Sequence, residues 1–195
     1  MEQFSEDALQ LRAKTVPIGV GVTYATVVAV AVTTGAATLA LALVRRLSAP
    51  RRPLAQLILG IGVIAAVAAG YGMRDAIVAL VDARADFSLR TDLWSRLLTY
   101  VAYRPVEGFG WFGTWSPDSF PFASLNFALG EQHTSALDAY LDVLLQLGWV
   151  GLLLFLTLGA LALARGWLVA TERRSTVHAW GPLTLVALLT FSLFE

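Results

Sequence analysis

Four long apolar stretches without a charged side chain constrain the fold of this chain more than any other feature. They cover Val16 to Val44, Leu54 to Met73, Val143 to Ala164 and Ser175 to Phe194. A helix needs about 20 consecutive apolar residues to cross the hydrocarbon core of a bilayer. Each stretch is therefore predicted to span a membrane. The predicted fold class is all-α: a polytopic integral membrane helical bundle with a large, partly helical extracytoplasmic loop.

The composition supports a membrane protein and excludes several other classes. Hydrophobic residues make up 57% of the chain and charged residues 14%, whereas soluble domains carry roughly 25% charged residues. This excludes an ordinary soluble enzyme and a disordered chain. The 14 basic residues equal the 14 acidic ones, so no nucleic-acid partner is indicated. The chain has no cysteine, which excludes disulfides, thiolate metal sites and a cysteine nucleophile.

The distribution of arginine predicts the orientation in the membrane. The two short links between spans carry Arg45, Arg46, Arg51 and Arg52 in one, and Arg165, Arg173 and Arg174 in the other. Short cytoplasmic loops collect Lys and Arg, so both links are predicted to lie inside and residues 74–142 outside. Gln3 to Lys14 are predicted to form a short amphipathic helix on the membrane or against the bundle.

The outer segment contains a predicted amphipathic helix with two arginines. Apolar residues recur at helical spacing from Leu89 to Val101, and Arg104-Pro105 ends the run because a residue before proline disfavours helix. Arg90 and Arg96 lie off the apolar stripe. Two interpretations remain open: both arginines extend to the membrane interface, or one binds an anionic group such as a phosphate.

A glycine-rich turn follows, from Gly108 to Gly113, with the formal spacing G-x-G-x-x-G. The dinucleotide-binding fingerprint needs a strand before it and a helix after it. Here Pro-Val-Glu precedes the turn and Thr-Trp-Ser-Pro follows it, so that interpretation is rejected. Trp111, Phe112 and Trp115 either belong to an aromatic belt at the membrane interface or form a stacking surface for sugar rings.

A polar segment before the third span contains the strongest catalytic candidate. Ser135 and Asp138 have capping-box spacing, which predicts a helix start there. His133 would lie just outside that helix N-terminus, where the dipole favours an anion and an imidazole is suited to general-base work. The alternative is a surface histidine in a polar loop. Asp138, Asp142 and Gln146 repeat every four residues, as a polar face lining the bundle or as paired glycosidase-type carboxylates.

Two blocks of these residues carry a resemblance to a known family. The first runs from Asp86 through Arg90 and Trp94 to Arg104-Pro105-Val-Glu-Gly108-Phe-Gly110, and the second from His133 to a helix that ends Gly148-Trp-Val-Gly151. An arginine before a tryptophan, a Pro-x-x-Gly-x-Gly turn and a histidine before a Gly-x-x-Gly helix occur in this order. That order resembles the C-terminal portion of the O-antigen ligase/polymerase superfamily.

The resemblance implies a function, partners and site residues. Members are membrane glycosyltransferases, including exopolysaccharide polymerases, of the bacterial plasma membrane. They transfer a glycan from an undecaprenyl-diphosphate-linked donor to a hydroxyl of a glycan or lipid-linked acceptor on the outer face, without metal or other cofactor. It implies that Arg90 binds the donor diphosphate and that His133 deprotonates or orients the acceptor hydroxyl. The candidate substrate-binding residues are Arg96, Arg104, Trp111, Trp115 and Asp138.

The chain also differs from these relatives. They are about twice as long, so we expect this chain to be the C-terminal portion, as a fragment, as a subunit that pairs with a separate N-terminal membrane half, or as a remnant. Thr33-Thr34 replaces a Ser-Arg pair that is common in relatives, and Thr134 replaces an asparagine. Two other functions stay open: a non-catalytic tetraspan scaffold, and part of a polysaccharide exporter. An exporter would need ionisable residues inside the spans, and the cores of the four stretches are uncharged, with one histidine near the start of the fourth.

Overall fold

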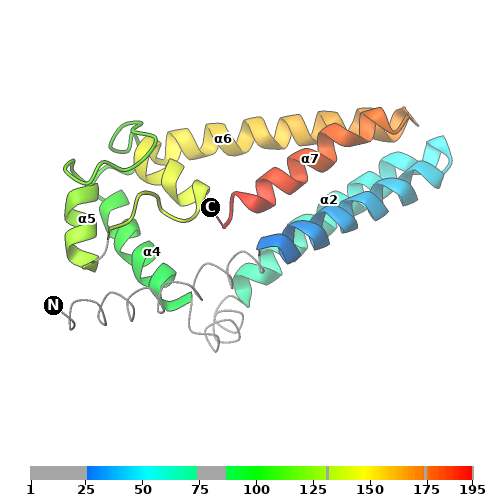
Figure 1. Cartoon of the computed structure of the whole chain (residues 1–195). Coiled ribbons are helices and arrows are strands. Elements are labelled where there is room, and N and C mark those ends of the chain that lie inside the picture. The colour runs from blue at the N-terminus through cyan, green and yellow to red at the C-terminus, as the bar shows by residue number, and fades with distance from the viewer. Residues whose placement is uncertain (1–25, 74–86, 131, 174, 195) are drawn as a thin grey trace.

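The computed structural model describes residues 26–73, 87–130, 132–173 and 175–194, and within these ranges it is helical without strands (Figure 1). The predicted all-α fold is confirmed. The predicted helix from Gln3 to Lys14, the start of the first predicted span and residues 74–86 lie outside the described ranges. The helices are Thr26–Arg46, η1 (Ala49–Arg51), α2 (Arg52–Gly72), α4 (Phe87–Val101), α5 (Phe122–Leu129), α6 (Ala139–Glu172) and α7 (Val177–Phe191).

Three helices are long and apolar enough to cross a membrane: Thr26–Arg46, Ala49–Gly70, which joins η1 to α2, and Ala139–Glu172. The fourth predicted stretch holds α7, a shorter apolar helix of 15 residues. Helices suit this environment because their backbone hydrogen bonds are satisfied within one segment. The apolar side chains of α2 are largely exposed, with Ile64 at 71%, as expected for a helix that faces lipid.

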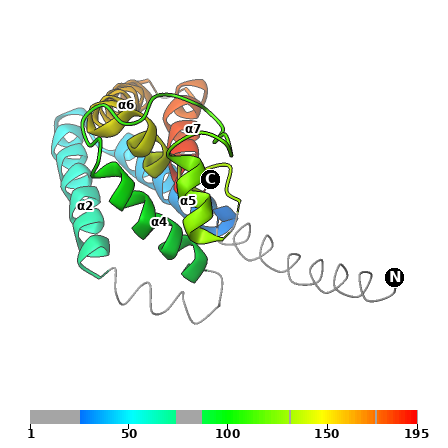
Figure 2. The same cartoon turned by 90° about the vertical axis from the view of Figure 1, so that its left-hand side faces the viewer.

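The arginine-rich links lie together at one end of the molecule, opposite α4 and α5 (Figure 1), and α4 and α5 face the viewer in Figure 2. Nε of Arg45 donates a hydrogen bond to the carbonyl of Ala170 at 2.7 Å, and Nε2 of Gln56 donates to Oγ1 of Thr171 at 2.8 Å. A guanidinium near the end of a helix satisfies carbonyls that have no helical partner and complements the negative end of the dipole. Arg45 and Gln56 therefore fasten the first two membrane helices to the last turns of α6.

Helix α6 is broken at Gly148, whose φ of 64° and ψ of −168° are not helical. The break divides α6 into a short first segment, Ala139–Leu147, and a long second one that runs with α7 along the bundle (Figure 1). The predicted third span, Val143 to Ala164, contains this break. The continuous apolar helix available for crossing the membrane therefore begins only after Gly148.

The start of α6 differs from the sequence prediction. The helix begins at Ala139 after the N-cap Asp138, whose Oδ1 accepts hydrogen bonds from the amides of Tyr140 at 2.8 Å and Leu141 at 3.0 Å. The predicted helix start at Ser135 is therefore wrong. The chain turns into the helix through Leu137, which has a positive φ of 55°. That conformation prevents the helix from extending back to Ser135.

The first segment of α6 joins α4, α5 and the loops between them in a packed head unit, defined here as residues 87–130 and 132–147. Its core is built mainly from leucine and aromatic side chains, and it continues to Leu152 in the second segment of α6. Its buried members within the head unit are Leu93, Leu97, Val101, Trp115, Phe122, Leu125, Ala136, Leu144 and Leu145. The three from α4 lie one turn apart, which confirms the amphipathic helix predicted there. Burying each large apolar side chain contributes about 1.5–3 kcal/mol, so the head unit has a core of its own.

Candidate functional site

The two glycine motifs of the sequence meet in one backbone interlock. The amide of Gly110 donates a hydrogen bond to the carbonyl of Gln146 at 2.8 Å. The amide of Trp149 donates one to the carbonyl of Pro105, also at 2.8 Å. A Cβ on Gly108 would overlap the carbonyl oxygen of Gln146, and one on Gly148 would lie 2.5 Å from the carbonyl carbon of Val106. The turn thus enters the break in α6, and each of the two contacting segments needs glycine at the point of closest approach.

The polar stripe of α6 holds the glycine-rich loop from inside. Gln146 is fully buried, and its Oε1 accepts hydrogen bonds from the amides of Phe112 at 2.7 Å and Gly113 at 3.1 Å. Its Nε2 donates to Oδ2 of Asp142 at 3.1 Å, and Nε1 of Trp115 donates to Oδ1 of the same carboxylate at 2.6 Å. A buried polar group is stabilising only when its hydrogen bonds are satisfied. The interior polar face expected from the four-residue repeat is therefore present at Asp142 and Gln146.

The two tryptophans of this loop have different surroundings. Trp115 is 2% exposed and its ring stacks on Phe122 with centroids 5.0 Å apart. Trp111 is 66% exposed. Trp115 therefore supports the loop from within the core, whereas the ring of Trp111 lies at the surface.

His133 lies on a loop held by the side chain of Asn126, a buried residue of α5. The amide of His133 donates to Oδ1 of Asn126 at 3.0 Å, and Nδ2 of Asn126 donates to the carbonyl of His133 at 3.1 Å. Helix α5 ends at Gly130 in the left-handed conformation, with φ 70°. This turn and the paired bonds fix the backbone of His133 and leave its side chain partly exposed.

Arg90 fastens the end of the same loop to α4. Its Nη1 donates to the carbonyls of Leu137 at 2.9 Å and Phe194 at 3.3 Å. One turn later, Nε1 of Trp94 donates to the carbonyl of Ala136 at 2.9 Å. The arginine and tryptophan of the first block therefore bind the segment that begins with His133, so residues far apart in the sequence share one unit.

Burial raises the pKa of Asp138, the N-cap residue that precedes α6, above the ordinary aspartate value. The amides of Leu141 and Tyr140 and the charge of Arg90 act in the opposite direction, but desolvation is the larger effect. The amides that Asp138 binds are those of the first turn of α6, the helix end where an anion is favoured. Asp138 itself satisfies these amides.

We expect Asp138→Asn to change the pH dependence of stability. A carboxyl whose pKa is raised by folding stabilises the fold below its ordinary value, and this contribution is lost as pH rises through the raised pKa. Asparagine also caps helices but does not titrate here. The free energy of unfolding of the native chain, relative to the variant, should fall as pH rises through this range. Thermal unfolding in detergent across acidic pH measures the difference, and a rise would show that burial does not dominate.

The remaining candidate residues are at the surface of the head unit. Arg96 is exposed on α4, on a different face from Arg90 because of the helical period. Arg104 is exposed, and its guanidinium carbon lies 5.7 Å from the ring centroid of Phe109, within cation–π range. Among the described residues, no group of three or more His, Cys, Asp or Glu could hold a metal ion.

Sequence reasoning missed Asn126 and the helix that carries it. The signal in the sequence is the amide side chain of Asn126 within Phe122–Leu129, a stretch in which Ser124 is the other polar residue. Such a residue must find a buried hydrogen-bond partner or face water. Its partner, the backbone of His133, could not be identified without the fold.

Membrane-spanning helices joined to a folded head unit define a polytopic helical membrane protein with its candidate chemistry at one end. The chain matches the family described as O-antigen ligase over residues 15–156. It therefore belongs to the O-antigen ligase family, which implies glycosyl transfer of the O-antigen ligase/polymerase type in general. No curated protein and no solved structure matches the chain significantly.

Proposed function

We propose that the head unit takes part in glycosyl transfer from an undecaprenyl-diphosphate-linked glycan to a hydroxyl of a glycan or lipid-linked acceptor. The proposed location is the outer face of the bacterial plasma membrane, and the proposed reaction uses no metal. The observation that carries this proposal is the 2.9 Å bond from Arg90 to the carbonyl of Leu137. It brings a guanidinium and the loop of His133 into the same small unit.

Arg90 is the proposed ligand of the donor diphosphate. A guanidinium carries five N–H donors in a planar fork, and this geometry matches the oxygens of a phosphate. Charge-assisted bonds of this kind stabilise a leaving group as negative charge develops on it. Arg90 would thus both hold the loop and neutralise the departing diphosphate.

His133 is the proposed general base. The imidazole takes the proton of the acceptor hydroxyl while that oxygen bonds to the anomeric carbon of the donor sugar. The bond from this carbon to the diphosphate oxygen breaks, and the diphosphate leaves with the electron pair. The paired bonds between Asn126 and the backbone of His133 support this role, because a general base must be held within hydrogen-bond reach of the proton it removes.

Exposed aromatic and basic groups near the glycine-rich loop are proposed to contact the glycan. Trp111 offers an open ring face and Arg104 an exposed guanidinium. Arg96 is a weaker candidate because it lies on a different face of α4 from Arg90. Trp115 and Asp138 are proposed to support the site through the loop and the N-cap rather than by touching substrate.

Binding of a radiolabelled polyprenyl-diphosphate glycan to the full chain in vesicles tests the role of Arg90. We expect Arg90→Lys to weaken binding by about 10- to 100-fold, because a hydrogen bond to a charged group contributes about 1.5–3 kcal/mol and lysine cannot replace a bidentate fork. The matched control is Arg165→Lys, an exposed arginine at the opposite end of the membrane helices.

The tryptophan circular dichroism of Arg90→Lys should match that of the native chain, which shows that the head unit is folded. Equal donor affinity in the native chain, Arg90→Lys and Arg165→Lys would remove Arg90 from the site. That result would favour the non-catalytic scaffold, in which Arg90 only fastens the loop to α4.

A further inference from the structure

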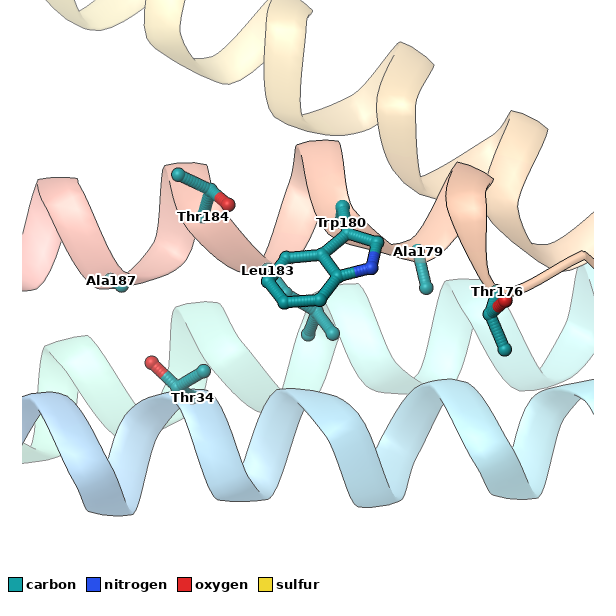
Figure 3. A pocket seen from close by; sticks show the side chains of 7 residues that line it. All are labelled: Thr34, Thr176, Ala179, Trp180, Leu183, Thr184 and Ala187. Carbon is teal, nitrogen blue, oxygen red and sulfur yellow. The ribbon is translucent and has the colours of Figure 1, made fainter.

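A groove of about 410 Å³ lies between the helix Thr26–Arg46 and α7 (Figure 3). Its lining is almost wholly apolar in surface and consists of Thr34, Thr176, Ala179, Trp180, Leu183, Thr184 and Ala187. The close-up places Thr34 across the gap from α7, which supplies the other side chains (Figure 3). The groove runs along the membrane helices, and none of the residues that line it is assigned to the proposed glycosyl transfer.

The dimensions of the groove limit what can occupy it. Its lining on α7 runs from Thr176 to Ala187, which is about 16 Å at the helical rise of roughly 1.5 Å per residue. This is about half of the 30 Å hydrocarbon core, or one leaflet. A long, narrow apolar groove of this volume suits one extended hydrocarbon chain. A helix of the same length, about 10 Å across, occupies roughly 1,200 Å³, more than the groove holds.

The groove begins at the arginine-rich end of the molecule. Nη2 of Arg45 donates to the carbonyls of Arg173 at 3.3 Å and Ser175 at 3.1 Å, directly before Thr176. Arg173 is exposed there. The side chain of Trp180 is 73% exposed in the lining near this end, and tryptophan favours the level of the lipid headgroups.

The charge at this end has one predominant sign. The described residues of the links and adjoining helix ends include six arginines, Arg45, Arg46, Arg51, Arg52, Arg165 and Arg173, against the single acidic residue Glu172. Basic side chains at a membrane surface attract anionic headgroups, each by about 1 kcal/mol. An apolar channel one leaflet long that opens beside guanidinium groups matches both parts of an anionic lipid.

We infer that this groove binds an anionic phospholipid, with one acyl chain between Thr34 and α7 and the phosphate beside Arg45 and Arg173. The far end of the groove is bounded by the hydroxyls of Thr33 and Thr190, which lie 3.0 Å apart. A chain that enters beside Thr176 therefore ends about halfway across the membrane. The acyl chain of the bound lipid fills the gap between α7 and the helix Thr26–Arg46.

Native mass spectrometry of the full chain tests this inference, after exchange with vesicles of equal parts phosphatidylglycerol and phosphatidylcholine. We expect the native chain to retain phosphatidylglycerol preferentially. Thr34→Leu should reduce retention of both lipids by filling the groove, and Ala187→Leu should do the same from α7. The matched control is Ala36→Leu, which adds the same bulk as Ala187→Leu but on an exposed face of the first membrane helix.

Arg173→Gln should lower the preference for phosphatidylglycerol about fivefold while total lipid retention stays unchanged. Equal retention of both lipids by the native chain would overturn the inference, as would equal retention in Thr34→Leu and Ala36→Leu. A change of oligomer mass in Thr34→Leu without loss of lipid would also overturn it, in favour of a protein partner.

Discussion

Gly148→Ala is expected to destabilise the protein by at least about 3 kcal/mol. The backbone conformation at this position, φ 64° and ψ −168°, is essentially restricted to glycine and costs another residue about 1–3 kcal/mol. The added Cβ would also meet the backbone of Val106 and lie 2.7 Å from the amide of Gly108. Relief requires the turn to leave the break in α6, which breaks the hydrogen bonds of the interlock. Thermal unfolding in detergent measures the loss.

Gly159→Ala is the matched control for this prediction. It lies in the same helix α6, and its nearest neighbour to an added Cβ is Cδ2 of Leu189 at 3.7 Å, an ordinary contact. We expect it to be neutral or slightly stabilising, because alanine favours helix more than glycine does. Equal stability of Gly148→Ala and Gly159→Ala would contradict the interlock. Gly108→Ala should resemble Gly148→Ala, and the two effects should not add, because both disrupt the same contact.

His133→Ala is expected to reduce glycan transfer by about 100- to 10,000-fold, the usual contribution of a general base. Donor binding should change little, because the diphosphate is assigned to Arg90 and the backbone bonds of residue 133 to Asn126 do not involve the imidazole. The measurement compares transferred glycan with bound donor in the same vesicles. A loss of transfer without a loss of donor binding distinguishes a catalytic group from one that only maintains the fold.

The control for His133→Ala is Gln132→Ala, an exposed neighbour on the same loop. We expect it to retain transfer. Undiminished transfer in His133→Ala would remove this residue from the reaction. Equal losses of binding and transfer would instead show that the imidazole acts through the fold of the loop.

The sequence could predict the parts of the fold that depend on local periodicity. Long uncharged stretches form helices in a bilayer core because a helix satisfies its backbone hydrogen bonds within one segment. The stripe through Leu93, Leu97 and Val101 follows the helical period because one face of α4 meets a core. Neither result depends on which distant segment packs against these helices.

The break in α6 could not be predicted in this way. Gly148 lies in a continuous apolar stretch, where glycine is common in membrane helices. Only the entry of the Gly108 turn from another part of the chain makes the non-helical conformation favourable. The pairing of two glycine motifs is a tertiary event, and each motif alone indicates only a turn or a close approach.

The capping-box spacing of Ser135 and Asp138 predicts a helix start at Ser135, because a sequence motif takes no account of hydrogen bonds from distant segments. The carbonyls of Ala136 and Leu137 accept hydrogen bonds from Trp94 and Arg90. Leu137 is held at a positive φ, so the helix begins only after the next capping residue, Asp138. The side chains of Arg90 and Trp94 thus hold the loop that runs from His133 to Leu137 in a non-helical conformation.

A photoreactive polyprenyl-diphosphate glycan, with its reactive group next to the diphosphate, tests most directly whether Arg90 and the His133 loop form one site. The full chain in vesicles would be irradiated with bound donor, and the labelled peptides identified by mass spectrometry. We expect labels on α4 near Arg90 and on residues 132–138, both suppressed by excess unlabelled donor. Labels confined to other segments, such as the arginine-rich end, would contradict the proposed site.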